Sequence, residues 1–374
     1  MRIPLSTPDI TEADIAAVTA VLRTSRLSLG PRMEEFEQSL ARYVGTTHAV
    51  AVNSGTSALH LCIRALGISE GDEVIVPSFA FIAVANVLRY ERAIPVFVDI
   101  DPQTLNLHPA GIEEAITPRT RAIIVVHTFG CPAALDEILE IARRRKLFVI
   151  EDACEALGAH FDGRKVGSFG DAAVFGFYPN KQITCGEGGM LVTTDSNLAA
   201  VARKLRNHGR SESGEWLQHE ELGFNYRISE LNCALGAAQL QRLESILQRR
   251  EAIAREYHCR LQDQADLEQP PIELPHRRIS WFVYVVRLSN RFATTHRDRI
   301  VQELASRGIT CGRYFAPIHL QPAYRAQQHR CMTLTHTESI ALRTLALPFF
   351  NRLTTTQIAE VCDTLVSLLS NFTS

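Results

Sequence analysis

The sequence lacks the features that would place the protein in a membrane or on a nucleic acid. Its 374 residues contain no apolar run close to the roughly 20 residues that a membrane helix needs. The first residues, MRIPLSTPDITEAD, lack the apolar core of a signal peptide. Lys and Arg number 39 against 41 Asp and Glu, so neither sign of charge dominates and we expect no nucleic-acid partner. The short basic run at residues 143–146 is interpreted as the solvated end of a helix.

Regular cysteine spacing is missing too. The nine cysteines are scattered and include no CxxC pair, so we expect reduced, mostly buried thiols in a cytoplasmic protein, and no metal site. Several enzyme signatures are also absent, since no GxGxxG follows a predicted strand and there is no P-loop, GxSxG or HExxH. His127 could act as a base, but no serine or cysteine nucleophile accompanies it in the sequence.

What the sequence does contain is a regular alternation of strand-like and helical segments. Segments such as residues 57–66 and 134–144 have helical periodicity. Between them stand short runs rich in Val and Ile, at residues 48–52, 73–77, 95–98, 121–126 and 147–150. This alternation predicts an α/β fold in which helices sandwich a mostly parallel sheet. In such sheets, ligands bind beyond the carboxyl ends of the strands.

The last third of the chain has a different pattern. Residues 230–261 are mostly helical, with an interruption at Gly236 where a close helix–helix approach is plausible. The proline-rich residues 268–278 are expected to form an exposed connection. A strand-like run at 281–288 and helical segments at 297–306 and 355–369 follow. We therefore predict a large domain at residues 1–245 and a smaller C-terminal α+β domain at residues 246–374.

Three short segments at predicted strand ends supply the groups needed to bind pyridoxal 5'-phosphate. Lys181 lies in the glycine-rich segment FYPNKQITCGEGGM, and a shielded lysine amine can bond covalently to the cofactor. Asp152 follows a buried-strand pattern, where a carboxylate can pair with a protonated pyridine nitrogen. Gly55 and Thr56 open a helix directly after a strand, so free N–H groups and the helix dipole can hold a phosphate. Phe81 could stack on a planar ring.

Each of these segments also has a plainer explanation. Thr56 or its neighbour Ser54 could simply cap the helix. Asp152 could cap a helix or form an ion pair, and Lys181 could face solvent. Phe81 could belong to the apolar core. Only the combination of the three segments favours a cofactor site over these structural roles.

A series of ordered motifs then extends over nearly the whole chain. They are LGP (29–31), SGTSAL (54–59), GDEVIVPSF (71–79), PVFVDID (95–101), VHTFG (126–130), EDACEALGA (151–159), FYPNKQITCGEGGM (177–190), LGFNYRISELNCALGAAQL (222–240), PIHLQPAY (317–324) and LPFF (347–350). Together they resemble the sugar aminotransferases of the DegT/DnrJ/EryC1/StrS family. The resemblance implies a fold type I pyridoxal-phosphate enzyme.

The resemblance also implies a role for each matching residue of the cofactor site. Lys181 would attach the cofactor covalently and then carry the proton between the alpha carbon of the amino compound and the cofactor. Asp152 would pair with the pyridine nitrogen. Gly55 and Thr56 would bind the phosphate, and Phe81 would stack on the ring.

Further implied roles concern the substrate and a second subunit. Asn225, in the motif Asn225-Tyr226-Arg227, would reach the phosphate site of the neighbouring subunit, which implies an obligate homodimer with shared active sites. Arg227, Tyr314 and His319 are candidates for the substrate side. Residues 210–222 and 312–325 are expected to select the acceptor.

Two positions depart from the family pattern. The family often has a serine five residues before the lysine as a phosphate ligand, and this chain has Gly176 there, so backbone groups are expected to hold more of the phosphate. The family commonly has Gln or His three residues after the aspartate, near the cofactor's 3-hydroxyl. The chain has Glu155, a carboxylate that needs a proton or a new partner and could shift the pKa of the cofactor linkage.

By resemblance, the expected reaction moves an amino group from glutamate or glutamine to a keto-sugar. The expected acceptor is a 4-keto- or 3-keto-6-deoxyhexose attached to a nucleoside diphosphate. One alternative is a pyridoxal-phosphate dehydratase, although family members of that type replace the lysine with histidine and this chain keeps Lys181. A cyclitol aminotransferase and a non-catalytic cofactor-binding regulator are further alternatives.

Overall fold

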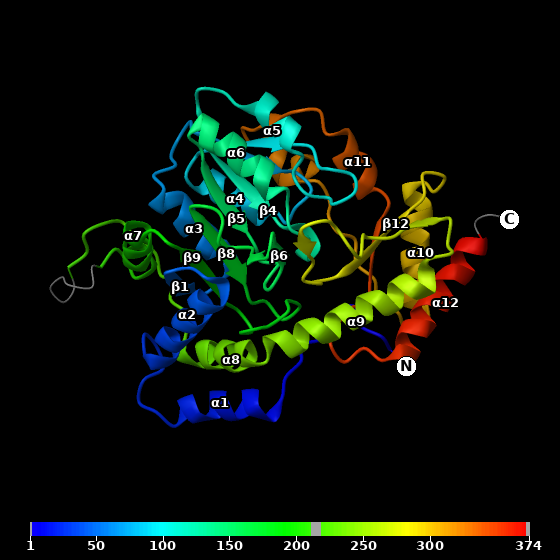
Figure 1. The fold of residues 1–374 in the computed structure, drawn as a ribbon, viewed down its shortest axis with the longest axis horizontal. Helices are drawn as coiled ribbons and strands as arrows, with labels where there is room; N and C mark the ends of the chain where they lie inside the picture. Colours follow the sequence, from blue (N-terminus) through cyan, green and yellow to red (C-terminus); the bar gives the residue numbers. More distant parts are fainter. Residues whose placement is uncertain (1, 211–217, 372–374) are drawn as a thin grey trace.

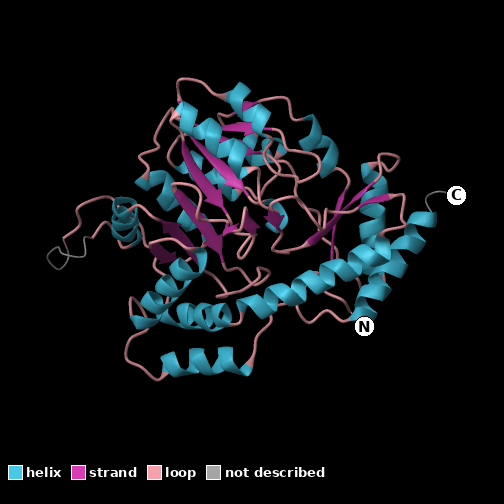
Figure 2. Ribbon diagram, in the orientation of Figure 1, coloured by secondary structure: helices cyan, strands magenta, loops and turns pink. Residues whose placement is uncertain are grey.

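The computed structural model describes residues 2–210 and 218–371, and an eight-stranded sheet forms its centre (Figures 1 and 2). The strands, in spatial order, are β1 (His48–Val52), β9 (Gly189–Thr193), β8 (Ala172–Gly176), β5 (Phe148–Asp152), β4 (Thr120–Val126), β2 (Glu73–Pro77), β3 (Ile94–Val98) and β13 (Arg330–Cys331). β9 runs antiparallel to both of its neighbours, while the remaining pairs are parallel. The structure thus confirms the predicted mostly parallel sheet.

Side chains on the two faces of this sheet enter two separate apolar cores. On β1, for example, Val50 and Val52 belong to one core, and Ala49 and Ala51 to the other, because successive side chains of a strand point to opposite faces. The first core is covered by α3 (Gly55–Ala65), α4 (Ala83–Tyr90) and α7 (Ser196–Arg206). The second is covered by α2 (Pro31–Val44), α5 (Pro109–Ala115), α6 (Leu135–Arg145) and α8 (Glu230–Gln241), and α1 (Glu12–Leu22) packs on α8. Helices therefore sandwich the sheet, as the alternation predicts.

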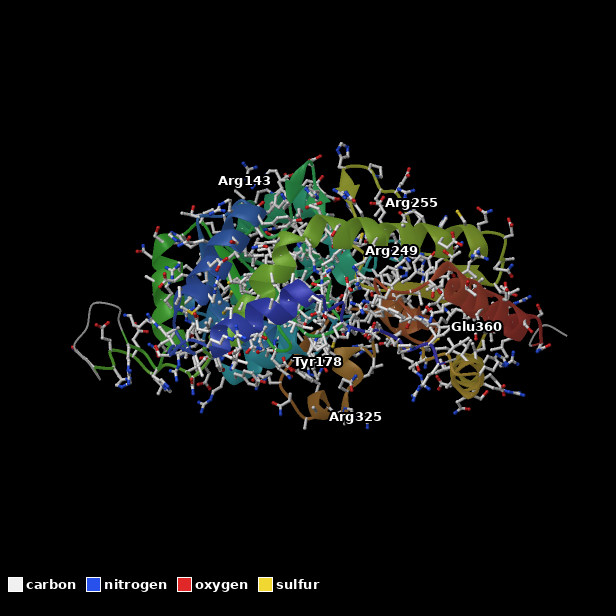
Figure 3. All side chains as sticks on the ribbon, turned by 90° about the horizontal axis from the view of Figure 1, so that it is seen from below. Arg143, Tyr178, Arg249, Arg255, Arg325 and Glu360 are labelled. Carbon is white, nitrogen blue, oxygen red and sulfur yellow. The ribbon has the colours of Figure 1, made fainter. Side chains whose placement is uncertain are left out.

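The basic run at residues 143–146 is indeed an exposed helix end. It closes α6, and Figure 3 shows Arg143 pointing away from the body of the protein. Arg144 and Arg145 form ion pairs with Glu113 of α5. Within residues 2–210 and 218–371, no helix combines the length and the apolar character needed to cross a membrane.

A third apolar core lies beside the large sheet. It is built from α9 (Leu243–Leu261), α10 (Thr294–Ser306), α12 (Thr355–Asn371) and the sheet of β10 (Leu267–Glu268), β12 (Tyr284–Leu288) and β14 (Thr344–Leu347). This is the predicted smaller α+β unit. Ile3 also packs in it, whereas β13 joins the large sheet, so the chain crosses between the two units more than once.

The long helix α9 connects the two units (Figure 1). Its first turns contribute Leu243 and Ile246 to a core of the large sheet, and its later turns contribute Ile253 and Tyr257 to the third core. The boundary at residue 245 remains a prediction. The remaining elements are α11 (Thr335–Ala341), a small sheet of β11 (Arg277–Arg278), β6 (His160–Phe161) and β7 (Arg164–Lys165), and the 3-10 turns η1 (Thr128–Gly130), η2 (Ile318–Leu320) and η3 (Pro322–Tyr324).

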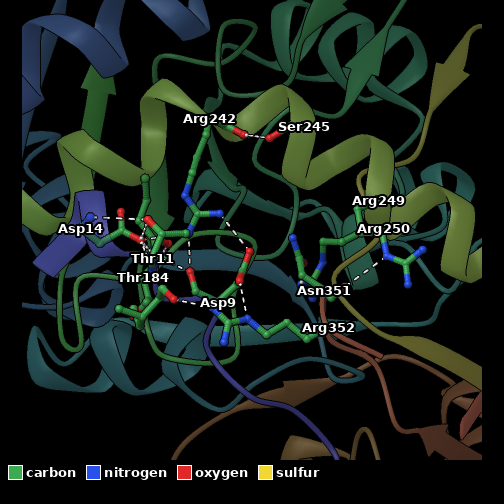
Figure 4. A network of polar contacts seen from close by, with 12 residues as sticks. Asp9, Thr11, Asp14, Thr184, Arg242, Ser245, Arg249, Arg250, Asn351 and Arg352 are labelled. Atoms are coloured by element: carbon green, nitrogen blue, oxygen red, sulfur yellow. Dashed lines mark hydrogen bonds and ion pairs between the residues drawn. The ribbon is translucent and has the colours of Figure 1, made fainter. Parts of the chain in front are cut away.

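The helical pattern at residues 230–261 is two helices, and the break is not at Gly236. It lies at Arg242, between α8 and α9, where φ is −109°. The Arg242 guanidinium is held by the carboxylates of Asp9 and Asp14, at 2.9 and 3.0 Å (Figure 4). Gly236 lies inside α8, where an added Cβ would come within 2.7 Å of Phe36 Cζ on α2. The glycine therefore permits the predicted close helix–helix approach without interrupting the helix.

Candidate active site

A cavity of about 560 Å³ opens at the carboxyl ends of β4, β5 and β8. This is the position at which ligands bind in parallel sheets. The structure brings together seven of the predicted site residues on its wall: Gly55, Thr56, Phe81, Asp152, Glu155, Lys181 and Tyr314. Their side chains come from five different parts of the chain, which only the fold places side by side.

Lys181 reaches this cavity from the loop between β8 and β9. The loop is closed at its base, because the Phe177 N–H donates to Gly188 O at 2.9 Å. The Lys181 side chain is 15% exposed, and its Nζ lies 3.5 Å from Glu155 Oε1. The same nitrogen lies 4.0 Å from the centre of the Phe282 ring. The amine is therefore shielded from bulk water and directed toward the cavity.

Helix α8 supports the lysine loop from behind. Asn232 Nδ2 donates to the backbone oxygens of Cys185 and Glu187, at 2.5 and 3.1 Å. The Thr184 N–H donates to Gln239 Oε1 at 3.0 Å, and Figure 4 shows Thr184 close to the Asp9 and Asp14 network. Sequence reasoning missed both α8 side chains. Their spacing of seven residues, two turns of helix, was the available signal.

Asp152 is the last residue of β5 and is buried, with 8% of its surface exposed. Its Oδ1 accepts a hydrogen bond from the N–H of Cys154 at 3.1 Å. A buried carboxylate on a cavity wall is stabilised by a cationic partner. A protonated pyridine nitrogen would supply that partner.

Glu155 lies opposite Lys181 and is equally buried. Its Oε2 accepts a hydrogen bond from the N–H of Phe129 at 2.9 Å. Burial raises the pKa of the Glu155 carboxyl above its ordinary value, and the Lys181 amine and the Phe129 N–H only partly oppose this effect. The predicted need of this carboxylate for a proton or a new partner is consistent with this geometry.

The start of α3 combines a helix cap with an open anion site. Ser54 is the N-cap, and its side chain accepts a hydrogen bond from the Ser57 N–H. Gly55 and Thr56, the first two helical residues, line the cavity. The first N–H groups of a helix have no partner within the helix, so they can bind an anion here. The capping role and the phosphate role are therefore compatible.

Close backbone packing holds this helix start in place. An added Cβ on Gly189, the first residue of β9, would lie 2.5 Å from Gly55 N and 2.3 Å from the Ser54 carbonyl. No real side chain tolerates such distances. The glycine of the GEGGM segment therefore lets β9 pass directly behind the start of α3.

Aromatic side chains form the rest of the wall. Phe81 is 62% exposed and lies at the cavity rather than in the core. Tyr314 lies on the wall with Phe282 and Phe315, and burial raises the pKa of its hydroxyl. Phe282 precedes β12 and was not anticipated from the sequence, because no local motif distinguishes it from a core residue.

Three predicted site residues lie elsewhere among the described residues. Asn225 is exposed and forms a β-bridge with Asn207, whose side chain also accepts a hydrogen bond from Arg227 Nη1 at 2.9 Å. His319 is bonded through Nδ1 to Ser78 Oγ at 2.7 Å and through Nε2 to Glu338 at 3.3 Å. Of the predicted acceptor-selecting segment 210–222, residues 211–217 lie outside the described residues.

The residues present fit pyridoxal phosphate. The cavity presents a shielded amine, a buried carboxylate and a helix N-terminus, and the planar ring of Phe81 lies on the same wall. These are the groups that the cofactor's aldehyde, pyridine nitrogen, phosphate and ring face require.

Comparison with known proteins agrees with this geometry. The DegT/DnrJ/EryC1/StrS aminotransferase family profile matches residues 8–366. The chain belongs to this family. It is 46% identical over 298 residues to the GDP-perosamine synthase of Caulobacter vibrioides, covering 79% of this chain and 80% of that protein.

Two solved structures share the whole fold. Helicobacter pylori PseC, an aminotransferase involved in the biosynthesis of pseudoaminic acid, superposes with a TM-score of 0.95, 28% identity and full coverage of both chains. The pyridoxal-phosphate form of Spr1654 from Streptococcus pneumoniae, a putative sugar aminotransferase, gives 0.94 and 27%, with 99% of each chain covered. The family, the fold type I architecture, the pyridoxal-phosphate cofactor and the sugar aminotransferase class predicted from the sequence are confirmed.

Proposed function

We propose that this enzyme moves an amino group from glutamate or glutamine to a nucleotide-linked keto-sugar, a 4-keto- or 3-keto-6-deoxyhexose. The observation that carries the proposal is the convergence of the Lys181 amine, the Asp152 carboxylate and the start of α3 on one cavity. The similarity to a GDP-perosamine synthase supports a nucleotide-linked acceptor. A cavity of about 560 Å³ is large enough for a cofactor and part of a substrate.

Each residue of the cavity has a distinct task in this proposal. Asp152 would hold the pyridine nitrogen in its protonated form, and the N–H groups of Gly55 and Thr56 would hold the phosphate. Phe81 would cover one face of the ring. Bound in this way, pyridoxal phosphate supplies an electron sink for the bond that breaks at the alpha carbon of the donor.

Lys181 is the residue we assign to proton transfer. Its Nζ lies inside the cavity, where Phe282 and Glu155 exclude much of the water. As a free amine it accepts the proton from the alpha carbon of the amino donor, and in the second half of the reaction it returns a proton to the carbon that receives the amino group. Glu155 Oε1 lies 3.5 Å from the amine and is placed to balance the charge that the amine gains with the proton.

Replacement of Lys181 by alanine tests this assignment. The variant is expected to lose at least about a thousandfold in turnover, since a positioned acid–base group contributes on this scale. The measurement is amino-group transfer from glutamate or glutamine to candidate keto-sugars, with the cofactor absorbance followed in parallel. Lys165→Ala, on β7 and outside the cavity wall, is the matched control and should retain activity. Transfer at a near wild-type rate by Lys181→Ala would refute the proposal, and a cofactor band that ignores every donor would indicate a regulator instead.

We further propose a homodimer with shared active sites. Asn225 is exposed and lies away from the cavity of its own chain. Apolar side chains near the cavity are also exposed, among them Phe81 at 62% and Tyr178 at 53%, and Figure 3 shows Tyr178 at the surface of the molecule. A second copy of the chain would cover these side chains and bring its Asn225 to the phosphate.

A mixing experiment tests site sharing directly. Lys181→Ala and Asn225→Ala are each expected to be poorly active, but a mixed dimer would contain one site with both residues intact. Random mixing should therefore restore about a quarter of the wild-type activity, as two-fold symmetry dictates. If mixing restores nothing, although sedimentation shows that mixed dimers form, the sites are not shared through Asn225.

We also infer a cytoplasmic location. All nine cysteines are unpaired in the structure, and seven of them are buried or partly buried: Cys62, Cys131, Cys154, Cys185, Cys233, Cys311 and Cys362. Free thiols persist in a reducing compartment. Labelling of these thiols in intact cells and after denaturation would show whether they are reduced there.

A further inference from the structure

The thiol of Cys154 lies where three backbone segments meet at one end of the cavity. These segments are the loop after β5, the start of α3 at Gly55 and the end of β8 at Gly176. An added Cβ on Gly55 would lie 2.9 Å from Cys154 Sγ, and one on Gly176 would lie 3.2 Å from the same atom. All three residues line the cavity beside Thr56. One sulfur atom therefore occupies the space in front of both glycines.

These distances leave little room for a side chain. Real Cβ atoms essentially never approach another atom within 3.0 Å, and contacts of 3.0–3.4 Å require the neighbour to move. A Cβ at Gly55 would force the sulfur to move, and one at Gly176 fits only if the sulfur gives way by a few tenths of an ångström. A Cβ on Gly176 would lie 3.4 Å from Cys154 Cβ, an ordinary van der Waals contact, so the sulfur is the atom that stands in the way.

The sulfur itself is held in position. The Cys154 N–H donates to Asp152 Oδ1 at 3.1 Å, and Sγ lies 3.9 Å from Val174 O. Burial and the Asp152 carboxylate raise the pKa of the thiol well above its usual range, so it stays neutral. A neutral, partly buried thiol is a poor nucleophile, and this one acts through its volume.

We propose that Cys154 and Gly176 are a matched steric pair that shapes the phosphate-binding end of the cofactor site. The thiol fills the volume that a side chain at position 176 would need, and the N–H groups at the start of α3 remain as the donors that reach the phosphate. Cys154 is thus a positioning residue. This inference rests on the cofactor assignment of the proposed function and deepens it.

A double-mutant cycle tests the pair through cofactor binding. The proteins are wild type, Cys154→Ala, Gly176→Ser and the double variant, each freed of cofactor and titrated with pyridoxal phosphate. Gly176→Ser alone should weaken binding about tenfold, because the serine displaces the thiol toward Gly55. In the Cys154→Ala background the same substitution should be neutral or strengthen binding by up to about tenfold, because the new hydroxyl has room to donate to the phosphate.

The phosphate itself is tested with a truncated probe. Pyridoxal, which lacks the phosphate, should show much less coupling between the two positions than pyridoxal phosphate. Cys233→Ala supplies the matched control, because Cys233 is a fully buried cysteine on α8 outside the cavity wall. The double variant Cys233→Ala, Gly176→Ser should bind pyridoxal phosphate as weakly as Gly176→Ser alone.

Additive effects of Cys154→Ala and Gly176→Ser on binding would overturn the inference, and so would equal coupling for pyridoxal. If Gly176→Ser fails to fold alone but folds with Cys154→Ala, the pair is supported. If both fail to fold, Gly176→Ala decides, because its single methyl group should still be rescued by Cys154→Ala. Binding is read without any amino donor, so a failure of amino transfer leaves this result intact, and an additive cycle leaves the Lys181 test intact.

Discussion

Glu151 and Glu155 stand four residues apart at the end of β5, and both are buried, yet their surroundings differ. Glu151 is 0% exposed and lies on the far side of the strand from the cavity, facing the loop after β7. Glu155 faces the cavity and Lys181. Two carboxyl groups of one chain segment thus belong to two different regions. Glu151 is part of the packed interior behind the strand, and Glu155 is part of the cavity wall.

The Glu151 region is fully satisfied. Its Oε2 accepts hydrogen bonds from the Gly167 N–H at 2.7 Å and from His127 Nε2 at 3.0 Å. Its Oε1 accepts from the N–H groups of Phe169 and Gly170, both at 2.8 Å. Burial alone would raise the pKa of Glu151, but the imidazole and the backbone donors outweigh it and hold that pKa below the ordinary value.

The Glu155 region has fewer donors. One backbone N–H and an amine 3.5 Å away face its carboxyl group, and the pKa is raised because burial dominates. The comparison shows that burial does not decide the charge of a carboxyl group by itself. The number of hydrogen-bond donors that face the carboxyl group decides its charge. Glu155, the group with fewer donors, is the one beside the Lys181 amine.

The largest effect expected from this comparison is on stability. Glu151→Ala should lower the free energy of unfolding by about 3–5 kcal/mol, because it strips an acceptor from several buried donors. Denaturant unfolding of the cofactor-free protein measures this change. Glu155→Ala should lower the free energy of unfolding by clearly less, because it leaves only the Phe129 N–H without its partner. If the two alanine variants are equally unstable, the distinction between the two regions is wrong.

His127 should show an intermediate effect. The Ala133 N–H donates to its Nδ1 at 3.1 Å, so Nε2 carries the proton that reaches Glu151. His127→Leu should cost about 1–3 kcal/mol, the usual range for an unpaired buried group, and should raise the pKa of Glu151. The loss of stability in acid would then begin at a higher pH. His336→Leu, at an exposed position on α11, is the control and should change stability little. If His127→Leu loses stability at the same acidic pH as wild type, the role given to the imidazole is contradicted.

The smallest effect is a difference in pH dependence. The lowered pKa of Glu151 stabilises the fold above about pH 4.5, and this contribution is lost as the pH falls through the folded-state pKa. The raised pKa of Glu155 acts in the opposite sense, since its contribution is present below about pH 4.5 and is lost as the pH rises through the folded-state pKa. Glu155→Gln in the cofactor-free protein should therefore gain stability relative to wild type as the pH rises. If the free energies of unfolding of Glu155→Gln and wild type change with pH in parallel, the raised pKa assigned to Glu155 is wrong.

Much of the fold could be predicted because its signals are local. Runs of Val and Ile bounded by turns mark the strands. β1 and β2 begin and end at the predicted residues, and the ends of β3, β4 and β5 lie within two residues of the predicted ones. The break in the helical region could not be located, because it depends on an arginine held by carboxylates more than 200 residues away in sequence.

The gathering of the candidate residues at one cavity could be predicted for the same reason. Asp152 ends a strand, Lys181 and the start of α3 follow strands, and parallel strands end at one edge of a sheet. Phe282, Asn232 and Gln239 could not be found in this way, because the first comes from another unit and the other two act from behind the loop. The roles of all the predicted site residues stay predictions, and Asn225, Arg227 and His319 lie away from the cavity of the described chain.

The sequence by itself determined which residues could carry the chemistry: a lysine in a glycine-rich turn, an aspartate at a strand end and a helix that opens on Gly55. Hydrophobic periodicity and the ends of strands depend on residues that are neighbours in the chain, so they can be recognised without a structure. Only the tertiary structure decided that Glu151 is an anchored anion and Glu155 a carboxyl group with a raised pKa. The donors that distinguish them come from His127, Phe129 and residues 167–170, and a pKa depends on what surrounds a group in space, not on its place in the chain.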